Sequence, residues 1–425
     1  PLNKVGSLRT YSWSKYWTQL GHEVKVLTTD KSFFSNLDLK EYNISQVEVL
    51  ECAFLFINFF KSFFKKSRPK LNQNSSRKNS FISDQIIKFK TLIRDMRSKY
   101  IGILFTIYDF WILPAYFCGI KLYNRWQYDI VVSSFGPPAS HIIAYLLKRK
   151  FKKVFWVADY RDLWSYNHIF KAKGIFKILQ WNIEKFIVRK TDLVSTVSDP
   201  LAHTLINTFQ KPTLIIYNGF DSDDYIKLNI SQYKDNKIKI IYTGNIYKRF
   251  RDPSPLFKAL KSLKEEFLNL NNYLEILFYG ENVYLLKGLV VDYALEDIVK
   301  LNGFYPRHVI LNLQANADML LFLETSKIEG IFSGKLFEYI GMRKPILAIG
   351  VNSNCVVGEF IEKLQVGIAV GEDIELIKKV IKDALENKYP FFNPKEDLIM
   401  NFSRLNLAKQ FIDEIYNYYL TSLKK

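Results

Sequence analysis

The sequence predicts an α/β protein built from two doubly wound, Rossmann-like domains. Apolar runs of strand length alternate with helical patterns in both halves of the chain, and 425 residues are enough for two cores of ordinary size. Alternation of this kind is typical of parallel sheets covered by helices. A polar, linker-like stretch at 227–237 lies between the two halves.

The first half of the chain begins with a helix and not with a strand. Residues 1–9 read as a loop, and residues 12–20 put Trp13, Tyr16 and Trp17 on one helix face. Because a parallel α/β fold of this kind begins with a strand, we expect the chain to lack its first strand. The later elements are predicted strands at 24–28, 129–134, 153–158, 192–197 and 214–217, and predicted helices at 139–150, at 184–189 and from Pro200.

The second half repeats the same alternation. Strands are predicted at 239–243, 275–279, 299–301, 319–323 and 346–349, and helices at 256–268 and 409–423. Ligands of open α/β sheets bind beyond the carboxyl ends of the strands. The polar residues that follow these strands are therefore the site candidates.

Charge and aromatic content indicate an anionic membrane surface as a partner. The chain has 60 Lys and Arg against 42 Asp and Glu, a formal charge of +18, and 16% aromatic residues. The basic residues are not gathered in one tail and no nucleic-acid-binding motif is present, so we expect no nucleic-acid partner. Within 52–128, an aromatic run at 54–64 followed by basic residues suits the headgroup layer. The run 101–123 contains Asp109 and Pro114, which leaves insertion in the bilayer or packing in the core as alternatives.

Cysteine spacing and absent motifs exclude several classes of protein. Cys52, Cys118 and Cys355 are far apart and form no CxxC or Cys/His cluster. This predicts a reducing compartment and no structural metal. The sequence lacks GxSxG, HExxH and GxxxxGK[ST], which disfavours α/β-hydrolases, zinc proteases and P-loop NTPases.

The stretch 329–350 carries the strongest functional pattern. Ser333 and Gly334 form a small-residue turn before a helical pattern, so backbone N–H groups at the helix start can face an anion. Lys335 adds a positive charge there. Glu338 follows one turn later, where a carboxylate can accept the paired hydroxyls of a ribose. A nucleotide diphosphate fits this pattern.

Three segments carry a resemblance to a known family, namely GKLFEY at 334–339, RDLW at 161–164 and NGFD at 218–221. Through them the chain resembles the retaining glycosyltransferases of family 4, and in particular the bacterial O-antigen and capsule branch with its N-acetyl-L-fucosamine transferases. The resemblance implies a GT-B fold, with two domains that face each other across a cleft. The implied domains are 1–222 with a membrane-facing insertion at 52–128, then 223–404, and a C-terminal helix at 405–425 that packs back on the first domain.

The resemblance also implies a donor site in the second domain. The family pattern has two glutamates eight positions apart, whereas Glu329 and Glu338 are nine apart. Glu329 would contact the donor sugar and Glu338 the nucleotide. The other implied donor residues are Gly244, Asn245, Lys248, Arg249, Arg251, Gly334, Lys335 and Leu336 at the diphosphate, and Gly280 and Tyr305 at the base. Arg251 is the strongest phosphate candidate among them.

In the first domain, the family has a glycine-containing loop that approaches a donor phosphate. Gly6, Ser7 and Arg9 match that loop in part. Gly6 would let the backbone come close to the phosphate. A plain surface loop is the alternative.

The segment DYRDLW supplies the acceptor side. Asp162 or Asp159 would orient or deprotonate an acceptor hydroxyl, and Arg161 would hold a phosphate or pair with these carboxylates. Arg161 and Asp162 align with a His–Asp pair of many family members. His141, near a predicted helix start, is a further candidate for an anionic group or the acceptor. We expect these residues and Trp164 to converge on one crevice.

The predicted activity is therefore glycosyl transfer by a retaining, metal-independent enzyme without a cofactor. The donor would be a nucleotide-diphosphate sugar, a UDP-sugar in the first instance. The acceptor would be a saccharide linked to polyprenyl diphosphate at the inner face of the bacterial cytoplasmic membrane. A sugar-nucleotide epimerase of the same fold and a non-catalytic scaffold protein are the alternatives.

Overall fold

The chain folds into two compact units, which are described separately. The computed structural model describes residues 5–30, 47–55, 100–104, 106–167, 172–226, 228–230, 236–246, 251–324 and 332–424. Unit 1 comprises Pro1–Ile216 with Ala408–Lys425, and unit 2 comprises Tyr217–Leu407. The divisions thus lie at 216/217 and 407/408, compared with 222 and 404 in the sequence-based prediction.

The strands of unit 1 are all parallel and form two separate sets. β3, β4, β5 and β6 make a four-stranded sheet in that order, while β1 and β2 pair only with each other among the described residues. The bounds are β1 Lys25–Thr29, β2 Glu48–Cys52, β3 Ile130–Ser134, β4 Phe155–Tyr160, β5 Leu193–Thr196 and β6 Thr213–Ile215.

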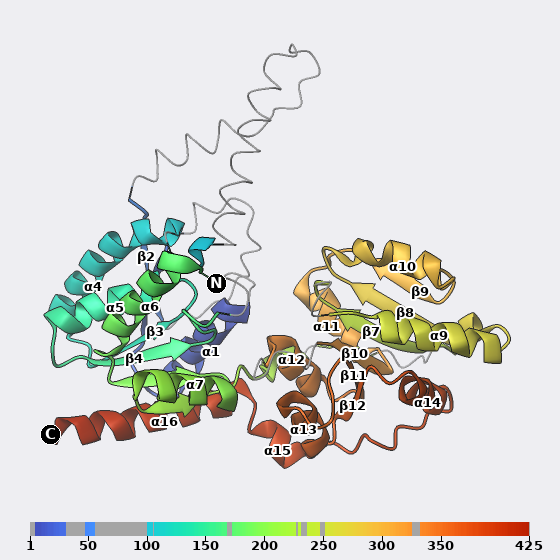
Figure 1. Cartoon of the computed structure of the whole chain (residues 1–425). Coiled ribbons are helices and arrows are strands. Elements are labelled where there is room, and N and C mark those ends of the chain that lie inside the picture. Colours follow the sequence, from blue (N-terminus) through green and yellow to red (C-terminus); the bar gives the residue numbers. More distant parts are fainter. Residues whose placement is uncertain are drawn as a thin grey trace, which may run out of the picture. The chain divides into compact units, whose positions relative to one another are not determined.

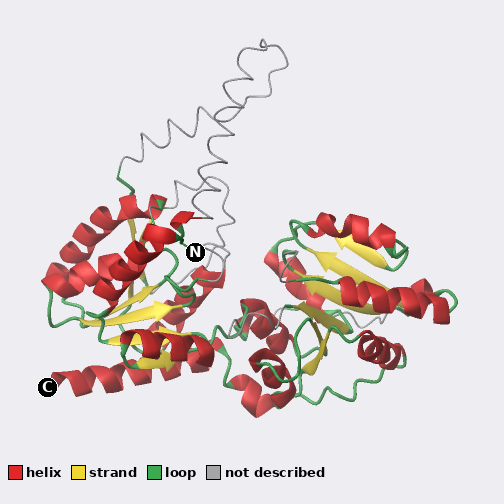
Figure 2. Cartoon of the chain, in the orientation of Figure 1, coloured by secondary structure: helices red, strands yellow, loops and turns green. Residues whose placement is uncertain are grey.

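Helices cover both faces of the unit 1 strands (Figures 1 and 2). Their bounds are α1 Val5–Gln19, η3 Ile107–Trp111, α4 Ile112–Trp126, α5 Ala139–Lys150, α6 Gly174–Val188, α7 Asp199–Phe209 and α16 Arg404–Leu423. Because successive side chains of a strand point to opposite faces, Trp156 and Tyr160 of β4 pack with α5 and α6, whereas Phe155 contacts Tyr419 of α16. The strands therefore lie between two helical layers.

The amino-terminal prediction requires a correction. Residues 5–9, which read as part of a loop, form the first turns of α1, and this helix ends at Gln19. The side chain of Arg9 is buried and bound to a carboxylate of β4, so a tertiary contact stabilises helix where the local sequence alone indicated a loop. Gly6 and Ser7 therefore lie on a helix and not in a phosphate-binding loop.

For the run 101–123, where bilayer insertion and core packing were the alternatives, the structure shows a helix with one face in the core. Residues 107–126 form η3 and α4, and Ala115, Gly119 and Leu122 of α4 are buried in the core of unit 1. Phe54 is buried as well, while residues 56–99 lie outside the described part of the chain. None of the helices within the described ranges is long and apolar enough to cross a bilayer.

The C-terminal helix packs back on the first unit, as predicted. Trp17 of α1 donates its indole N–H to the carbonyl oxygen of Ala408 at 2.8 Å. Phe411 lies against the rings of both Trp13 and Trp17, with centroid distances of 5.0 and 5.7 Å. The first part of the apolar face predicted at 409–423, with Phe411, Ile412 and Ile415, is thereby buried.

Unit 2 is built on one six-stranded parallel sheet of order β12-β11-β10-β7-β8-β9. The strand bounds are β7 Ile238–Thr243, β8 Leu274–Tyr279, β9 Val299–Asn302, β10 Met319–Leu323, β11 Ile346–Ile349 and β12 Gly367–Gly371. Almost all of their side chains are buried on both faces, which is typical of parallel sheets and explains why the sequence shows them as continuous apolar runs.

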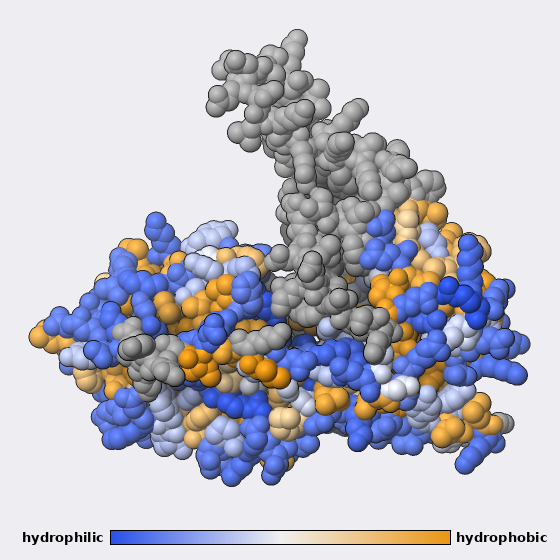
Figure 3. Space-filling model, turned by 180° about the vertical axis from the view of Figure 1, so that it is seen from behind, coloured by the Kyte–Doolittle hydropathy of each residue, from blue (hydrophilic) through white to orange (hydrophobic). Residues whose placement is uncertain are grey.

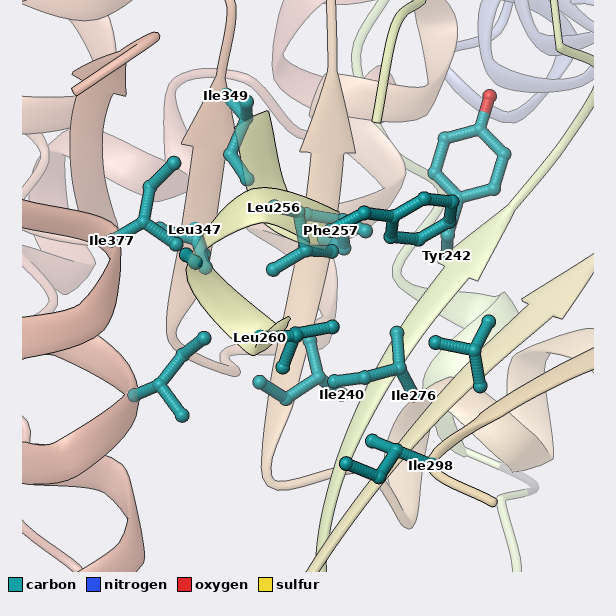
Figure 4. Packing of buried hydrophobic residues seen from close by; sticks show 14 of the residues in the cluster. Ile240, Tyr242, Leu256, Phe257, Leu260, Ile276, Ile298, Leu347, Ile349 and Ile377 are labelled. Carbon is teal, nitrogen blue, oxygen red and sulfur yellow. The ribbon is translucent and has the colours of Figure 1, made fainter. Parts of the chain in front are cut away.

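Two helical layers cover this sheet. One core joins alternate strand residues to α9, α10 and α14, and Figure 4 shows Ile240, Ile276 and Leu347 of the strands packed toward Leu260 of α9 and Ile377 of α14. The other core joins the intervening strand residues to α11, α12 and α13. The helix bounds are α8 Asp223–Ile226, α9 Ser254–Glu266, η4 Leu270–Asn272, η5 Val283–Leu286, α10 Lys287–Asp292, α11 Arg307–Ala315, α12 Gly334–Met342, α13 Val356–Lys363, α14 Ile374–Leu385 and α15 Glu396–Met400.

Candidate active site

The unit 2 sheet has its topological switch point between β7 and β10. From β7 the chain proceeds to β8 and β9 on one side, and then returns to β10, β11 and β12 on the other. Ligands of doubly wound sheets bind at such a point, beyond the carboxyl ends of the strands. Gly244 follows β7 there, Glu324 follows β10, and Gly334 opens α12.

A buried ammonium group occupies this point. Lys335 Nζ has no hydrogen-bond partner within the described part of the protein, and it lies 4.2 Å from the centroid of the Tyr242 ring. A side chain at Gly244 would collide with it, because a Cβ built there would be 2.2 Å from Nζ. Burial and, to a lesser degree, the charge of Arg251 lower the pKa of Lys335 to about 7, although the charges of Glu338 and Glu324 act in the opposite direction. Among the described residues, the Lys335 ammonium therefore forms no hydrogen bond or ion pair, and only the more distant charges of Glu338 and Glu324 favour it.

The start of α12 adds donors to the same place. Ser333 is the N-cap residue, but its side chain makes no capping hydrogen bond, and its hydroxyl is buried without a partner in the described residues. Uncapped N–H groups at a helix start, together with the helix dipole, favour an anion. Leu336 offers no free donor, because its side chain is fully buried in the core and its backbone N–H donates to the carbonyl oxygen of Ser333 at 3.0 Å.

Arg251 approaches this region from the loop after β7. It donates from Nη1 to the carbonyl oxygen of Asn245 at 3.2 Å, and its Nη2 lies 3.5 Å from a carboxylate oxygen of Glu324. Both side chains are mostly buried, at 19% and 14% exposure. Arg251 is thus held beside the switch point, as a phosphate ligand would need to be.

Glu338 lies one turn after Lys335 and is tightly held. Its Oε1 accepts a hydrogen bond from Gln314 Nε2 at 2.8 Å, and its Oε2 accepts one from Arg307, which also donates to Asp224 at 2.8 Å. Burial alone would raise the pKa of Glu338, but the charge of Arg307 and these hydrogen bonds lower it below the usual value. The carboxylate is therefore ionised at neutral pH and fixed in orientation.

Of the other residues predicted at the donor site, Gly280 and Tyr305 are described by the structure and three are not. Gly280 packs so closely on the loop after β7 that an added Cβ would lie 2.2 Å from the carbonyl oxygen of Gly244, so a close backbone approach accounts for this glycine. Tyr305 is 43% exposed and meets Tyr279 edge-on. Glu329, Lys248 and Arg249 lie outside the described residues.

In unit 1, Asp159 is a buried structural anion and not an exposed base. Its Oδ1 accepts hydrogen bonds from Arg9 Nη2 and Ser195 Oγ, both at 2.9 Å, and its Oδ2 accepts one from Ser134 Oγ at 2.9 Å. The side chains of Arg9 and Asp159 are 2% and 0% exposed. The prediction that Asp159 contacts the acceptor and Arg9 a phosphate therefore requires correction, because these two ions neutralise each other.

His141 also lies in the core and not at the surface. Its Nδ1 is 2.8 Å from Ser133 Oγ, which accepts the indole N–H of Trp156 at 2.8 Å. Burial lowers the pKa of His141 to about 3, although the charge of Asp159 acts in the opposite direction. The ring is therefore neutral at physiological pH and cannot attract an anionic group, contrary to the prediction.

Arg161 and Asp162 are the two accessible charged residues of DYRDLW. Arg161 donates from Nε to Asp162 Oδ2 at 3.1 Å, and the two side chains are 26% and 36% exposed. Trp164, expected in the same crevice, is almost fully buried. Of the predicted acceptor-side residues, only Arg161 and Asp162 can thus meet a ligand at this edge of unit 1.

Sequence reasoning missed the residues that hold Glu338. Arg307 and Gln314 stand seven positions apart on α11, so they lie on one face of that helix two turns apart. Gln314 also donates to the hydroxyl of Thr243 at 2.9 Å. The sequence does contain a signal for this site, namely two polar residues seven positions apart on a helix face that is otherwise apolar.

Comparison with known proteins agrees with this architecture. Residues 93–224 match the family model described as Glycosyltransferase Family 4. Across the whole chain, the structure is similar to sucrose-phosphate synthase from Thermosynechococcus elongatus, with a TM-score of 0.62, 12% identity and coverage of 98% of this chain and 93% of that chain. The fold is GT-B.

Two further GT-B structures resemble the chain over most of its length. A glycosyltransferase from Rickettsia africae has a TM-score of 0.60, 14% identity and coverage of 97% of this chain and 94% of that chain. WaaG, a glycosyltransferase involved in lipopolysaccharide biosynthesis, has a TM-score of 0.51, 14% identity and coverage of 99% and 95%. No curated protein sequence matches the chain. At these identities, the structural similarities establish the GT-B fold of the two units.

Proposed function

We propose that the protein transfers a sugar from a nucleotide-diphosphate donor to an acceptor hydroxyl. The observation that carries this proposal is the buried ammonium of Lys335 at the start of α12, which has no hydrogen-bond partner among the described residues and lies at the switch point of the unit 2 sheet. The match of residues 93–224 to Glycosyltransferase Family 4 and the GT-B fold support the same reaction class.

The donor diphosphate would be the counter-ion of Lys335. During transfer, the bond between the anomeric carbon and the diphosphate oxygen breaks, so negative charge develops on the leaving diphosphate. Lys335, Arg251 and the N–H groups of α12 would stabilise that charge without a metal ion. Glu338, held ionised by Arg307, would accept the ribose hydroxyls.

The acceptor hydroxyl forms the new bond to the anomeric carbon and loses its proton. We assign contact with the acceptor to Arg161 and Asp162, the accessible pair at the carboxyl edge of β4. The leaving diphosphate would take the proton, as in retaining transfer on one face of the sugar. Asp162 would orient the hydroxyl, and Arg161 would hold an acceptor phosphate.

A lipid-linked acceptor at the inner membrane face, in O-antigen or capsule synthesis, is the second part of the proposal. Supporting it is the outer side of α6, where Ile175, Ile178 and Phe186 are 75%, 61% and 47% exposed beside the basic residues Lys177 and Lys185. Apolar side chains flanked by lysines suit an anionic headgroup layer. Figure 3 shows that hydrophobic residues also reach the surface among hydrophilic ones on the face that it presents.

A transfer assay tests the activity. The protein is incubated with a panel of nucleotide-diphosphate sugars and a polyprenyl-diphosphate saccharide in anionic vesicles or in neutral vesicles. We expect one donor to be consumed only when acceptor is present, with a higher rate on anionic vesicles at low salt. The variant Lys335→Met should lose at least ~100-fold in turnover, and Lys264→Met, an exposed lysine of unit 2, should retain the wild-type rate.

Other outcomes of this assay would contradict the proposal. Conversion of a nucleotide sugar to its epimer without acceptor would identify an isomerase. Absence of turnover with every donor, together with intact polysaccharide synthesis in cells that carry Lys335→Met, would indicate a scaffold protein.

Donor binding should depend on pH through Lys335. Because the pKa of Lys335 is about 7 in the free protein, the side chain is mostly a charged ammonium below pH 7 and mostly a neutral amine above it. The two phosphates of a nucleotide sugar are diesters and lack the second ionisation of a monoester. We therefore expect affinity to fall by up to ~10-fold per pH unit above pH 7, and binding at pH 8 to take up about one proton. Calorimetry in buffers of different ionisation enthalpy measures this uptake, which Lys335→Met should abolish.

A further inference from the structure

Helix α6 carries two buried polar side chains that have no role in the transfer reaction proposed above. Gln180 and Glu184 are 1% and 2% exposed and stand one turn apart on the same face of the helix. That face continues with the apolar residues Ile187 and Val188, which are buried in the core of unit 1. Glutamate and glutamine are rarely buried unless they are hydrogen-bonded, so their partners indicate what they do.

Both side chains bind one peptide group, the one that joins Trp164 to Ser165. Gln180 Nε2 donates to the carbonyl oxygen of Trp164 at 3.1 Å. Glu184 Oε2 accepts the backbone N–H of Ser165 at 2.9 Å. The C=O and N–H of a trans peptide lie in one plane and point in opposite directions, so two contacts of this kind fix both the position and the plane of the group. We call these two contacts the α6 clamp.

The amide of Gln180 is itself held in one orientation. Its Oε1 accepts the backbone N–H of Ile103 at 3.1 Å, which leaves Nε2 to face Trp164. Gly102 lies so close that an added Cβ would be 2.9 Å from Oε1, so the amide is also confined sterically. The donor end of Gln180 is therefore directed at the loop after β4, and a carboxylate at position 180 would have no proton to donate there.

Glu184 supplies a hydrogen-bond acceptor at a cost. Burial raises the pKa of Glu184 to about 7, although hydrogen bonding by Ser165 acts in the opposite direction. A glutamine at position 184 has the same shape, and its side-chain carbonyl can accept the same N–H without a buried charge. The variant Glu184→Gln therefore keeps the contact with the loop, whereas Glu184→Met removes it.

The clamped peptide directly follows the accessible pair Arg161 and Asp162. Residue Tyr160 ends β4, so only residues 161–163 lie between the sheet and the clamp. The side chain of Trp164 is buried in the core, which anchors the same point of the chain. A short segment held at both ends has few conformations, and side chains that must meet a ligand accurately are usually supported in this way.

We propose that the α6 clamp positions the acceptor, by fixing the loop that carries Arg161 and Asp162. The inference rests on the proposed function, in which this pair contacts the acceptor. Gln180 and Glu184 are then positioning residues that act through the backbone and touch no substrate. Misplacement of a reacting group by ~1 Å can cost on the order of 100-fold in rate. Loss of the clamp should therefore impair use of the acceptor and leave donor binding unchanged, because the donor residues belong to unit 2.

Kinetics of isosteric variants test the positioning role. With the polyprenyl-diphosphate saccharide of the transfer assay, Glu184→Met and Gln180→Glu should lower kcat/KM for the acceptor by about 30- to 100-fold. Their affinity for UDP, measured by calorimetry, should stay within about 2-fold of wild type, while Glu184→Gln should keep acceptor kinetics within about 3-fold. Asn182→Ala, an exposed position on the same helix, is the matched control and should behave like the wild type.

Amide exchange of the free protein measures the clamp without any substrate. The Ser165 amide should exchange at least ~30-fold faster in Glu184→Met than in the wild type and keep its protection in Glu184→Gln. Unchanged exchange in β4 and β5 shows that unit 1 is folded. If Glu184→Met does not fold, the comparison of Gln180→Glu with Glu184→Gln decides the question.

Three results would overturn the inference. The first is an unchanged Ser165 amide in a folded Glu184→Met variant. The second is normal acceptor kinetics in a variant whose Ser165 amide exchanges faster. The third is an equal loss of UDP and acceptor affinity, which would mean a general structural role. Absence of transfer by the wild-type protein with every donor would instead refute the proposed function, and faster Ser165 exchange would then show a clamp that serves the fold alone.

Discussion

Replacing Arg9 with methionine is expected to lower the free energy of unfolding of unit 1 by about 3–5 kcal/mol, because a buried carboxylate would lose its counter-ion. Asp159 is fully buried and would keep only the hydroxyl donors Ser134 and Ser195. Urea denaturation, with amide exchange of β4 and β5 to assign the transition to unit 1, measures the loss.

Two controls separate this effect from loss of packing. The double variant Arg9→Met with Asp159→Asn removes both charges and should recover most of the stability. Arg125→Met breaks an exposed pair with Glu48, whose partners are 59% and 41% exposed, and should cost less than about 1 kcal/mol. A single Arg9→Met variant as stable as Arg125→Met would contradict the role assigned to the buried pair.

The variant Arg307→Met is expected to lower the free energy of unfolding of unit 2 by a comparable amount, about 3–5 kcal/mol. The guanidinium binds both Glu338 and Asp224, and without it the burial of Glu338 would raise its pKa instead of leaving it lowered. In the wild type, the Glu338 carboxylate stabilises the fold at pH values above the pKa that it has in the unfolded chain. This contribution is lost as the pH falls through the lower pKa that Glu338 has in the folded protein. In the variant, stability is instead lost as pH rises. Wild type and variant should therefore converge toward pH 4 and differ most near pH 7.

Denaturation across this pH range, with Arg307→Met combined with Glu338→Gln, checks the cause. The double variant should regain most of the loss at pH 7 and show a flatter pH profile than Arg307→Met alone. Lys264→Met, which breaks the exposed pair with Asp297, is the matched control in the same unit. A loss that is constant from pH 4 to pH 8 would mean that the charge of Glu338 is not its origin.

Most strands could be predicted, and those buried on both faces leave the clearest local pattern, whereas β2 and β12 were missed. The runs at 319–323 and 346–349 coincide with β10 and β11, and the helix predicted at 139–150 coincides with α5. Each of these elements is specified by its own apolar residues and by small or breaking residues next to it. Fold class follows from their alternation.

The partners of the charged residues could not be predicted in the same way. Arg9 and Asp159 are 150 positions apart, and Arg307 and Glu338 are 31 apart, so no local pattern joins them. Sequence reasoning therefore interpreted Asp159 and Arg9 as ligand contacts, although each neutralises the other. Lys335 differs, because its place at a helix start after a buried strand is a local property, and the structure brings it to the switch point.

The return of α16 to unit 1 has a consequence for synthesis of the protein. Trp17 and its partner Ala408 are separated by 391 positions, so the apolar face of α1 stays uncovered on the ribosome until nearly the whole chain has emerged. At a translation rate of roughly 5–20 residues per second, that interval is on the order of 20–80 s. Unit 1 is thus synthesised before unit 2 but is completed only after it.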